Sequence, residues 1–438
     1  MLYILLAFII IAAFFIIMQW TELGFALVII IPLVKDIFQL PEEQIPLLNL
    51  LFLFVLFTII SFLYKYSFKL KDIKLNREHL GLFIIFSSIL LFSLNYSNEL
   101  KYGADKILKF IFFAGFFFLS SMAIFQSKRK VDNFVNFLRY SILAISIINL
   151  ILLVRHLTSQ GFFAVIVRFT MVEGNSSPIT MARVSGLGVL LWFLSTLESE
   201  SLKQKLWSIV AIIPIALTLI ATNTRGPLLI VFVMIIVYLF FYLDVSINKK
   251  LLALGLIFFI IVTLALVLPE SVFLRFILLF RKSNLNTNQS LVNASSAARR
   301  LIFFRRLFQY LATHPWQIFL GTGAGSFFHL FKDYQLAHYP HNIFLEILFE
   351  QGILGLSIFI VSLLVLLRDF NKFIFQNKQL QTWVLPLVMG FIYYFLNAQI
   401  SGDIDNNRFI WFFWGALIGV IIPIASKKAE KSKFLTTK

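Results

Sequence analysis

The chain has 438 residues, of which 60% are hydrophobic and 13% are charged, and its mean hydropathy is +0.89. These values exclude a soluble globular protein, because average soluble domains carry about 25% charged residues. The net charge is +17, and the absence of cysteine excludes disulfides, thiolate catalysis and cysteine-bound metals.

A series of apolar runs separated by short charged loops predicts an all-α protein, a polytopic membrane helical bundle. The runs are Leu2–Trp20, Gly24–Val34, Leu47–Tyr64, Leu80–Tyr96, Ile107–Phe125, Phe134–Val154, Ile179–Leu197, Leu206–Thr222, Gly226–Leu243, Leu251–Leu268, Ile343–Leu367, Thr382–Ile400 and Phe409–Ala425. Because the second run is short, we expect about thirteen spans, or about twelve if it continues the first run as one broken helix. The first run lacks a basic leader and a cleavage site, which predicts a retained helix rather than a signal peptide.

Lysine and arginine gather in alternate loops, which predicts that these loops face the cytoplasm. The basic loops are Lys65–Arg77, Lys128–Lys130, Lys203 with Lys205, Lys249 with Lys250, Arg368–Lys378 and the tail Lys427–Lys438. This distribution accounts for the positive charge, so we expect membrane lipids and not nucleic acid as partners. We expect N-terminal transmembrane helices over 1–268, a long external loop over 269–342, and C-terminal transmembrane helices with a basic cytoplasmic tail over 343–438.

Within the external loop, Ala297–Ala312 places apolar residues at helical spacing with arginines on the flanking faces. The pattern predicts an amphipathic helix along the outer membrane surface, ended by Pro315. Its arginines at 299, 300, 305 and 306 could attract anionic headgroups or bind the phosphates of a substrate.

Three glycines, Gly321, Gly323 and Gly325, follow this helix. They allow a tight turn with exposed N–H groups, so an anion nest for a diphosphate is one interpretation. A nucleotide loop is not expected, because the turn lacks the Lys and Ser/Thr of a P-loop and faces away from the cytoplasm.

Polar side chains continue into the next apolar helix, which is expected to begin near Ile343. Asn342 can cap this helix, and Glu346 and Glu350 follow on roughly the same face. Glu350 would lie about 12 Å along the axis, where a carboxylate inside a membrane is costly and usually functional. His341 can accept a proton near neutral pH, although a lone interfacial histidine is often structural.

Two further arginines lie at the external ends of apolar runs. Arg225 could snorkel to the interface or bind phosphate oxygens with its guanidinium fork. Arg183 could line the same cavity or pair with Glu350.

A metal site is not expected. His314, His329 and His338 fit no recognised ligand spacing. Asp403 and Asp405 could hold a divalent cation, but their Asp/Asn-rich surroundings favour an ordinary turn.

Several of these segments, in this order and spacing, resemble the bacterial O-antigen ligase and O-antigen polymerase superfamily. They are Arg300, THPWQIFLGTGAGSF at Thr313–Phe327, His341–Asn342, EILFEQGILGL at Glu346–Leu356, and upstream Thr224–Arg225–Gly226, which resembles the second motif of the family. The resemblance covers roughly the second half of the chain. Arg305 resembles a second, less constrained arginine of the family, and Phe304 stands where the family often has Trp.

The resemblance implies a GT-C-like, metal-independent, inverting glycosyltransferase without cofactor, in the bacterial inner membrane with its site on the periplasmic side. The donor would be an undecaprenyl-diphosphate-linked oligosaccharide. Arg225 and Arg300 would neutralise the departing diphosphate, and His341 would activate the acceptor hydroxyl or assist the leaving group. Substrate-binding residues would be Arg183, Arg305, Gly321, Gly323, Asn342 and Glu350, with Glu350 orienting the His341 end of its helix.

Polymerase and ligase share these motifs. We favour a polymerase that joins lipid-linked repeat units, for which a chain-length regulator protein is a further partner. The alternative within the family is a ligase that transfers the glycan to lipid A core. The alternative of another class is a transporter or flippase of lipid-linked sugars, which would place charges at mid-membrane on several helices.

Overall fold

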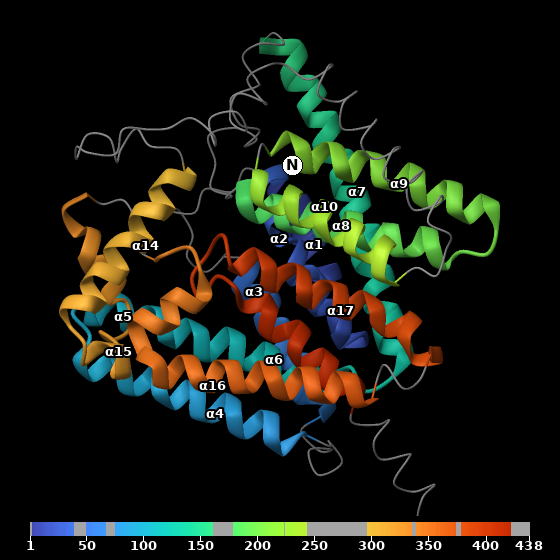
Figure 1. Cartoon of the computed structure of the whole chain (residues 1–438). Coiled ribbons are helices and arrows are strands. Elements are labelled where there is room, and N and C mark those ends of the chain that lie inside the picture. Colours follow the sequence, from blue (N-terminus) through green and yellow to red (C-terminus); the bar gives the residue numbers. More distant parts are fainter. Residues whose placement is uncertain are drawn as a thin grey trace, which may run out of the picture. The chain divides into compact units, whose positions relative to one another are not determined.

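The computed structural model describes residues 2–38, 50–66, 75–160, 178–222, 224–242, 296–334, 339–373 and 378–421. Within these ranges the regular secondary structure is helical, and none of it is strand (Figure 1). This confirms the predicted all-α fold.

Six helical stretches are long and apolar enough to cross a membrane: Arg77–Tyr96, Leu100–Ile124, Lys128–Leu152, Pro178–Glu198, Leu202–Ala221 and Ile343–Lys372. Shorter apolar helices are Ile10–Gln19, Thr21–Ile31, Phe52–Tyr66, Arg225–Phe240, Thr382–Ala398 and Arg408–Ile421. Each predicted apolar run that lies within the described residues coincides with one of these helices. The run Leu251–Leu268 lies outside the described residues. The protein is therefore a multi-pass membrane protein.

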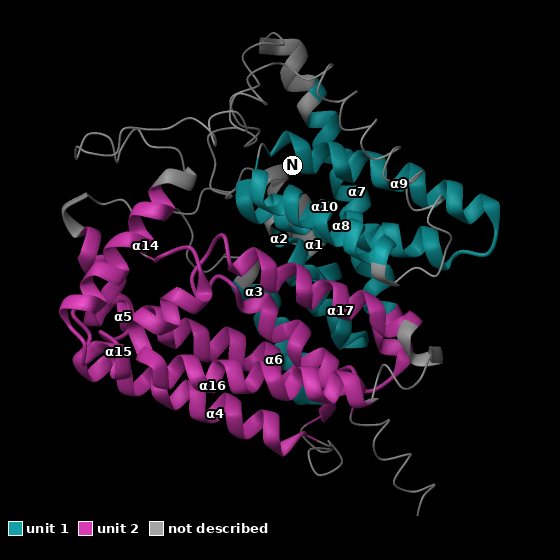
Figure 2. Cartoon of the chain, in the orientation of Figure 1, with its two compact units in different colours: residues 1–64, 133–281 teal, residues 65–132, 282–438 magenta. Residues whose placement is uncertain are grey.

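The chain forms two compact units, and each draws on two separate stretches of sequence (Figure 2). Unit 1 contains Met1–Tyr64 and Asn133–Arg281, and unit 2 contains Lys65–Asp132 and Lys282–Lys438. Unit 2 therefore combines an early pair of membrane helices with the whole C-terminal part of the chain.

Unit 1 is built from α1 (Leu2–Gln19), α2 (Thr21–Phe38), most of α3 (Leu50–Tyr66), most of α7 (Lys128–Gln160), α8 (Pro178–Glu198), α9 (Leu202–Ala221), α10 (Arg225–Val237) and the π turn η5 (Tyr238–Tyr242). Trp20 alone separates α1 from α2. Helix α8 is central to the packing, and a Cβ at its Gly188 would meet Ile142 of α7 and Ile215 of α9. A residue without a side chain lets these three helices approach closely.

Unit 2 is built from α4 (Arg77–Phe92) with the 3-10 turn η3 (Ser93–Tyr96), α5 (Leu100–Lys109), the π turn η4 (Phe110–Ala114), α6 (Gly115–Ile124), α14 (Ser296–Thr313), α15 (Gln317–Leu320), η6 (Ser326–Tyr334), α16 (Ile343–Phe373), α17 (Lys378–Ala398) and the helix Arg408–Ile421. Its core is aromatic. The Trp411 ring lies 5.3 Å from the rings of Phe83, Phe110 and Trp414. Much of the abundant phenylalanine of the sequence thus serves helix packing.

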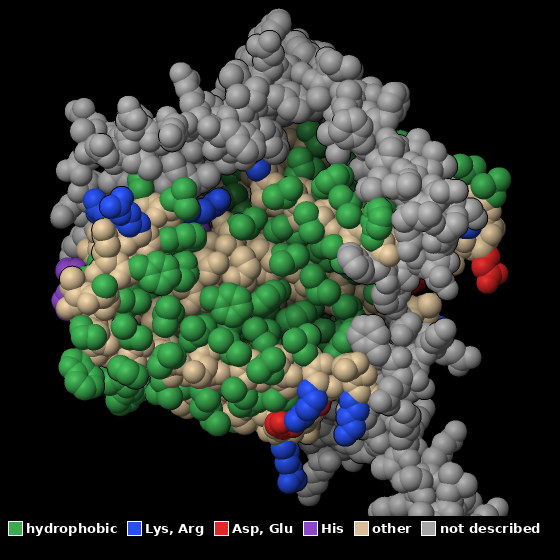
Figure 3. All heavy atoms as spheres, viewed as in Figure 1, with side chains coloured by type: hydrophobic (Ala, Val, Ile, Leu, Met, Phe, Trp, Pro, Cys, Tyr) green, Lys and Arg blue, Asp and Glu red, His purple; other side chains and the backbone are tan. Residues whose placement is uncertain are grey.

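Ion pairs join the start of α4 to the far end of α16, so these two helices run antiparallel. Arg368 lies 2.7 Å from Glu78, and the buried His79 lies 3.2 Å from Asp369. Figure 3 shows Lys and Arg of unit 2 gathered at this end and over α14, with hydrophobic side chains covering the face between them. Charged ends and an apolar middle are the pattern of a membrane-spanning bundle.

Candidate functional site

Helix α16 begins at Ile343, as predicted, but it is broken at Gly352. This glycine has φ 68° and ψ −168°, a left-handed conformation inside the helix. A Cβ at Gly352 would collide with the backbone of Phe319 and Gly321, so only glycine permits this approach. A helix that ends leaves its last carbonyls without intrahelical partners, and in a membrane each of them needs another donor.

The turn that starts at Gly321 supplies these donors. The backbone N–H and the hydroxyl of Thr322 donate to Phe349 O at 2.8 and 2.9 Å, and Gly323 N–H donates to Glu350 O at 3.0 Å. The glycine turn therefore caps the outer segment of α16, residues 343–351.

The remaining N–H groups of the turn are also used within the protein. Gly321 N–H donates to Gln317 O at 2.8 Å, and Ala324 N–H donates to Ser93 O at 3.4 Å. Four successive N–H groups thus point to protein carbonyls. The N–H groups of Gly321 and Gly323 thus donate within the protein, which disfavours the anion nest, and contact of these glycines with a substrate stays a prediction.

The same turn is fastened on its other side to the connection between η3 and α5. Gly323 has φ 92°, and a Cβ there would collide with the backbone of Ser97. The hydroxyl of Ser97 donates to Ala324 O at 2.6 Å, and Asn98 N–H donates to the hydroxyl of Ser326 at 3.1 Å. The glycines therefore allow close contact between the backbones of three segments: α16, the glycine turn, and the connection between η3 and α5.

Asn342 caps the start of α16, as predicted. Its Oδ1 accepts from Leu345 N–H at 3.0 Å, and its Nδ2 donates to Gln399 O at 3.3 Å. The cap thus ties the start of α16 to the end of α17. Contact of Asn342 with a substrate stays a prediction.

A buried ionic triad holds the outer segment of α16. Lys106 Nζ of α5 lies 2.5 Å from Glu346 Oε1 and 2.6 Å from Glu350 Oε2. The exposed fractions of these residues are 3%, 1% and 1%. Glu346 Oε1 also accepts from Ile404 N–H at 3.2 Å, so the triad joins α5, α16 and the loop before the last helix.

One ammonium faces two carboxylates in this triad. The buried triad therefore keeps a net negative charge unless one of the two carboxylates is protonated. Glu346 Oε2 and Glu350 Oε1 are buried and have no hydrogen-bond partner among the described residues. The glutamates share one helix face, as predicted. The sequence pattern does not single out Lys106, because this residue directly precedes the apolar run Ile107–Phe125. The need of two buried carboxylates for a cation was the signal that could have found it.

The loop after α17 contains Asp403 and Asp405. Asp403 Oδ1 accepts from both the N–H and the Nδ2 of Asn406 at 2.8 Å, which confirms the predicted turn. Burial raises the pKa of the Asp405 carboxyl to about 6, against the lowering effect of Arg408.

Helix α14 is amphipathic, as predicted. Its buried residues Phe303, Leu307 and Leu311 pack in one cluster with Phe327, Phe331 and Phe349 of η6 and α16. Arg306 covers this cluster, with its guanidinium 5.2 Å from the Phe331 ring, and Arg305 is exposed.

His341 lies directly before the Asn342 cap and has φ 61°, the single positive φ among the described non-glycine residues. This conformation is uncommon outside glycine and often marks a functional position. The imidazole stacks on Phe303 of α14, with ring centroids 6.2 Å apart and planes at 18°. The Tyr339 ring meets it edge-on at 4.6 Å.

Arg300 precedes Phe303 by one helical turn on α14, and it interacts electrostatically with Tyr339. Burial lowers the pKa of its guanidinium, Tyr339 opposes this, and neighbouring Arg299 adds to it. The Arg300 Nε is buried and has no hydrogen-bond partner among the described residues. Arg300 and His341 thus have Tyr339 as a common neighbour, and their joint role in one site stays a prediction.

The other predicted arginines belong to unit 1. Arg225 is the first residue of α10, and Arg183 lies in α8 with 5% of its surface exposed. Glu350 forms an ion pair with Lys106, and a pairing of Arg183 with Glu350 stays a prediction. Of the three histidines for which no metal site is expected, His314 stacks on Tyr310, His329 lies 3.5 Å from Glu99, and His338 lies outside the described residues.

Comparison with known proteins gives two matches. Residues 209–360 match the family model of the O-antigen ligase, a stretch that includes Arg225, Arg300 and α16 as far as Ile360, beyond its break. The chain is also 26% identical over 259 residues to an O-antigen polymerase of Salmonella muenchen, which is 57% of this chain and 59% of that relative. The chain thus spans about three fifths of the curated relative it matches, and no solved structure matches it. The motif order, the helical membrane fold and these two matches together make the chain similar to the O-antigen ligase and polymerase superfamily.

Proposed function

We propose that the protein is a glycosyltransferase that polymerises a surface polysaccharide on the periplasmic face of the bacterial inner membrane. The donor is an undecaprenyl-diphosphate-linked glycan, and the acceptor is another lipid-linked repeat unit. The observation that supports this proposal is that the partly buried Arg300 and His341 both have Tyr339 as a neighbour, directly before the start of α16.

The reaction suits these two groups. The bond between the anomeric carbon of the donor sugar and the diphosphate breaks, and the electron pair leaves with the diphosphate. The acceptor hydroxyl oxygen bonds to the same carbon from the opposite face, which inverts its configuration. The imidazole of His341 takes the hydroxyl proton, and the guanidinium of Arg300 stabilises the charge that develops on the diphosphate.

The surroundings of His341 support its role as a base. Stacking on Phe303 and the edge contact with Tyr339 restrict the imidazole, and its positive φ is a strained conformation that packing maintains. The buried Nε of Arg300 offers a hydrogen bond to an anionic oxygen.

Arg225 and Arg183 enter the proposal as further phosphate-binding groups from unit 1. The start of α10 and the guanidinium of Arg225 carry the same sign, so both favour an anion there. The family match includes Arg225, which supports this assignment. On unit 2, the exposed Arg305 is free to approach the glycan or the diphosphate from α14.

A ligase is the second candidate, because the matching family model carries that description. We favour the polymerase because the curated relative is an O-antigen polymerase. Gene deletion separates them on a polysaccharide gel. Loss of a polymerase leaves single-repeat product, whereas loss of a ligase leaves unmodified core together with lipid-linked polymer.

Purified protein in detergent tests the activity itself. Wild-type protein should elongate a lipid-linked repeat unit with no second compartment present, a result that a transporter would not give. His341→Ala and Arg300→Ala should abolish product without loss of protein from the membrane. Matched controls are His314→Ala and Arg129→Ala at exposed positions, which should retain activity. Near-normal turnover by either site variant would remove that residue from the proposed site.

A further inference from the structure

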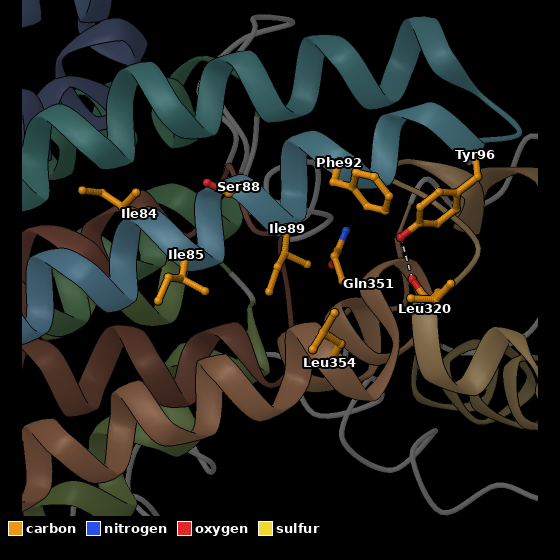
Figure 4. A pocket seen from close by; sticks show the side chains of 9 residues that line it. All are labelled: Ile84, Ile85, Ser88, Ile89, Phe92, Tyr96, Leu320, Gln351 and Leu354. Carbon is orange, nitrogen blue, oxygen red and sulfur yellow. Dashed lines mark hydrogen bonds between the residues drawn. The ribbon is translucent and has the colours of Figure 1, made fainter.

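A groove of about 330 Å³ opens in unit 2 between α4 and α16, beside α15 (Figure 4). Its apolar lining comprises Ile84, Ile85, Ile89, Phe92, Leu320 and Leu354. Such a volume lies within the usual range of ligand sites. Several lining residues are well exposed, including Ile85 at 48% and Phe92 at 60%. Because α4 and α16 are membrane helices, the groove opens to hydrocarbon, and a lipid chain is the occupant that fits it.

One end of the groove is polar. Gln351 is 2% exposed, and its Nε2 has no hydrogen-bond partner among the described residues. The Tyr96 hydroxyl is nearby and donates to Leu320 O at 2.6 Å (Figure 4). A buried amide donor without an acceptor is costly in a membrane. The Gln351 amide therefore offers a hydrogen bond to an oxygen that follows the lipid chain.

The groove is shaped for an amphiphile that enters from the external side. The predicted topology places the Tyr96 end of α4 outside and its Arg77 end in the cytoplasm. Along α4 and η3 the lining runs from Ile84 to Tyr96, roughly 18 Å by helical rise. A chain in the groove would thus point into the bilayer, with its polar end at Gln351.

The distance to the proposed reaction centre indicates which lipid this is. Gln351 lies eight residues beyond Ile343, about 12 Å along the helix that starts beside His341. The donor carries its diphosphate on the reacting carbon, so the donor diphosphate must lie at His341 and Arg300. The acceptor reacts at the far end of its oligosaccharide, so its lipid must lie some distance away.

We propose that this groove binds the isoprenoid chain of the lipid-linked acceptor, with the Gln351 amide donating to the first oxygen of its diphosphate. The proposal rests on the proposed polymerase function. It assigns the lipid of the acceptor to the groove between α4 and α16. The lipid of the donor then lies near α14 and His341.

The test separates donor from acceptor with purified protein in nanodiscs. The donor has its non-reducing hydroxyl blocked, so it cannot act as an acceptor. The acceptor carries the same glycan on either an undecaprenyl or a geranyl chain. Ile85→Trp fills the groove and should raise the KM for the undecaprenyl acceptor about tenfold, with kcat near the wild-type value. With the geranyl acceptor, which is too short to occupy the groove fully, KM should change little.

Leu91→Trp is the matched control, because Leu91 is 45% exposed on the same helix and does not line the groove. This variant should behave as wild type. Gln351→Leu keeps the side-chain size but removes the amide, and it should raise the same KM about threefold to tenfold. It also serves as the second variant if the Ile85 variant fails to fold.

Three outcomes would overturn the assignment. A raised KM for the blocked donor instead of the acceptor would place the donor chain in the groove. Equal effects on both acceptor chains, or none, would leave only bulk membrane lipid as its occupant. Wild-type protein that forms no product from either acceptor would count against the polymerase function itself, whereas the first two outcomes leave that function standing.

Discussion

Replacing Lys106 with methionine removes the cation of a buried triad and keeps the length of the side chain. Glu346 and Glu350, each 1% exposed, then face each other without an ammonium. Removing one partner of a buried pair typically costs about 3–5 kcal/mol, because an uncompensated charge stays in a medium of low dielectric. Since one ammonium serves two carboxylates here, we expect Lys106→Met to lower the free energy of unfolding by about 3–5 kcal/mol.

Reversible unfolding in mixed micelles measures this loss. The informative comparison is the triple variant Lys106→Met, Glu346→Gln and Glu350→Gln, which removes all three charges at nearly constant volume and should recover most of the lost stability. The matched control is Lys109→Met. Lys109 lies 2.6 Å from Asp105, but both side chains are at least half exposed. We therefore expect Lys109→Met to lower the free energy of unfolding by about 0.5 kcal/mol or less.

Two results would refute this reasoning. One is a Lys106→Met variant that loses no more stability than Lys109→Met. The other is a triple variant that is as unstable as the single one, because the loss would then come from packing and not from charge.

Three further predictions concern the backbone and pH. Gly352→Ala should destabilise the protein by about 2 kcal/mol or more in the same unfolding assay, because its Cβ would collide with Phe319 and φ is 68°; Gly81→Ala, with open space around its Cβ, should be neutral or stabilising by up to about 1 kcal/mol. His341→Gly should abolish turnover yet raise stability by up to about 1 kcal/mol, since glycine relieves the positive φ; a variant that is both inactive and less stable would argue against stored strain. Burial raises the pKa of Asp405 from 3.8 to about 6, so its stabilising contribution is complete below pH 3.8 and disappears as the pH rises through about 6. Thermal unfolding of Asp405→Asn should lack the part of the stability loss that wild type shows between these pH values, and an unchanged pH profile would contradict the raised pKa.

The sequence predicted those features that depend on local pattern. Apolar length gave the membrane helices, side-chain chemistry gave the Asn342 cap and the Asp403 turn, and spacing gave the amphipathic helix α14. Each of these depends on residues a few positions apart, so neighbouring sequence contains the necessary information.

The features that sequence reasoning missed depend on contacts between distant segments. A glycine turn can bind an anion or cap a helix, and only the position of the Phe349 and Glu350 carbonyls decides between them. Gly352 follows Glu350 and Gln351 within the run that was predicted as one helix, and a single glycine inside a helical pattern is usually tolerated, so the local sequence does not establish the break. The pairing of Lys106 with two glutamates more than 200 residues away is likewise a property of the folded bundle.

The break at Gly352 also divides α16 into a part that is fixed to unit 2 and a part that can adjust to the lipid. Residues 353–373 form the longer part of this membrane helix, and membrane helices tilt when the bilayer becomes thinner or thicker. The left-handed Gly352 allows a bend at that point, while residues 343–351 remain fastened to unit 2 by the capping turn and Lys106. We therefore expect the stacking of His341 on Phe303 of α14 to persist when the membrane composition changes the tilt of residues 353–373.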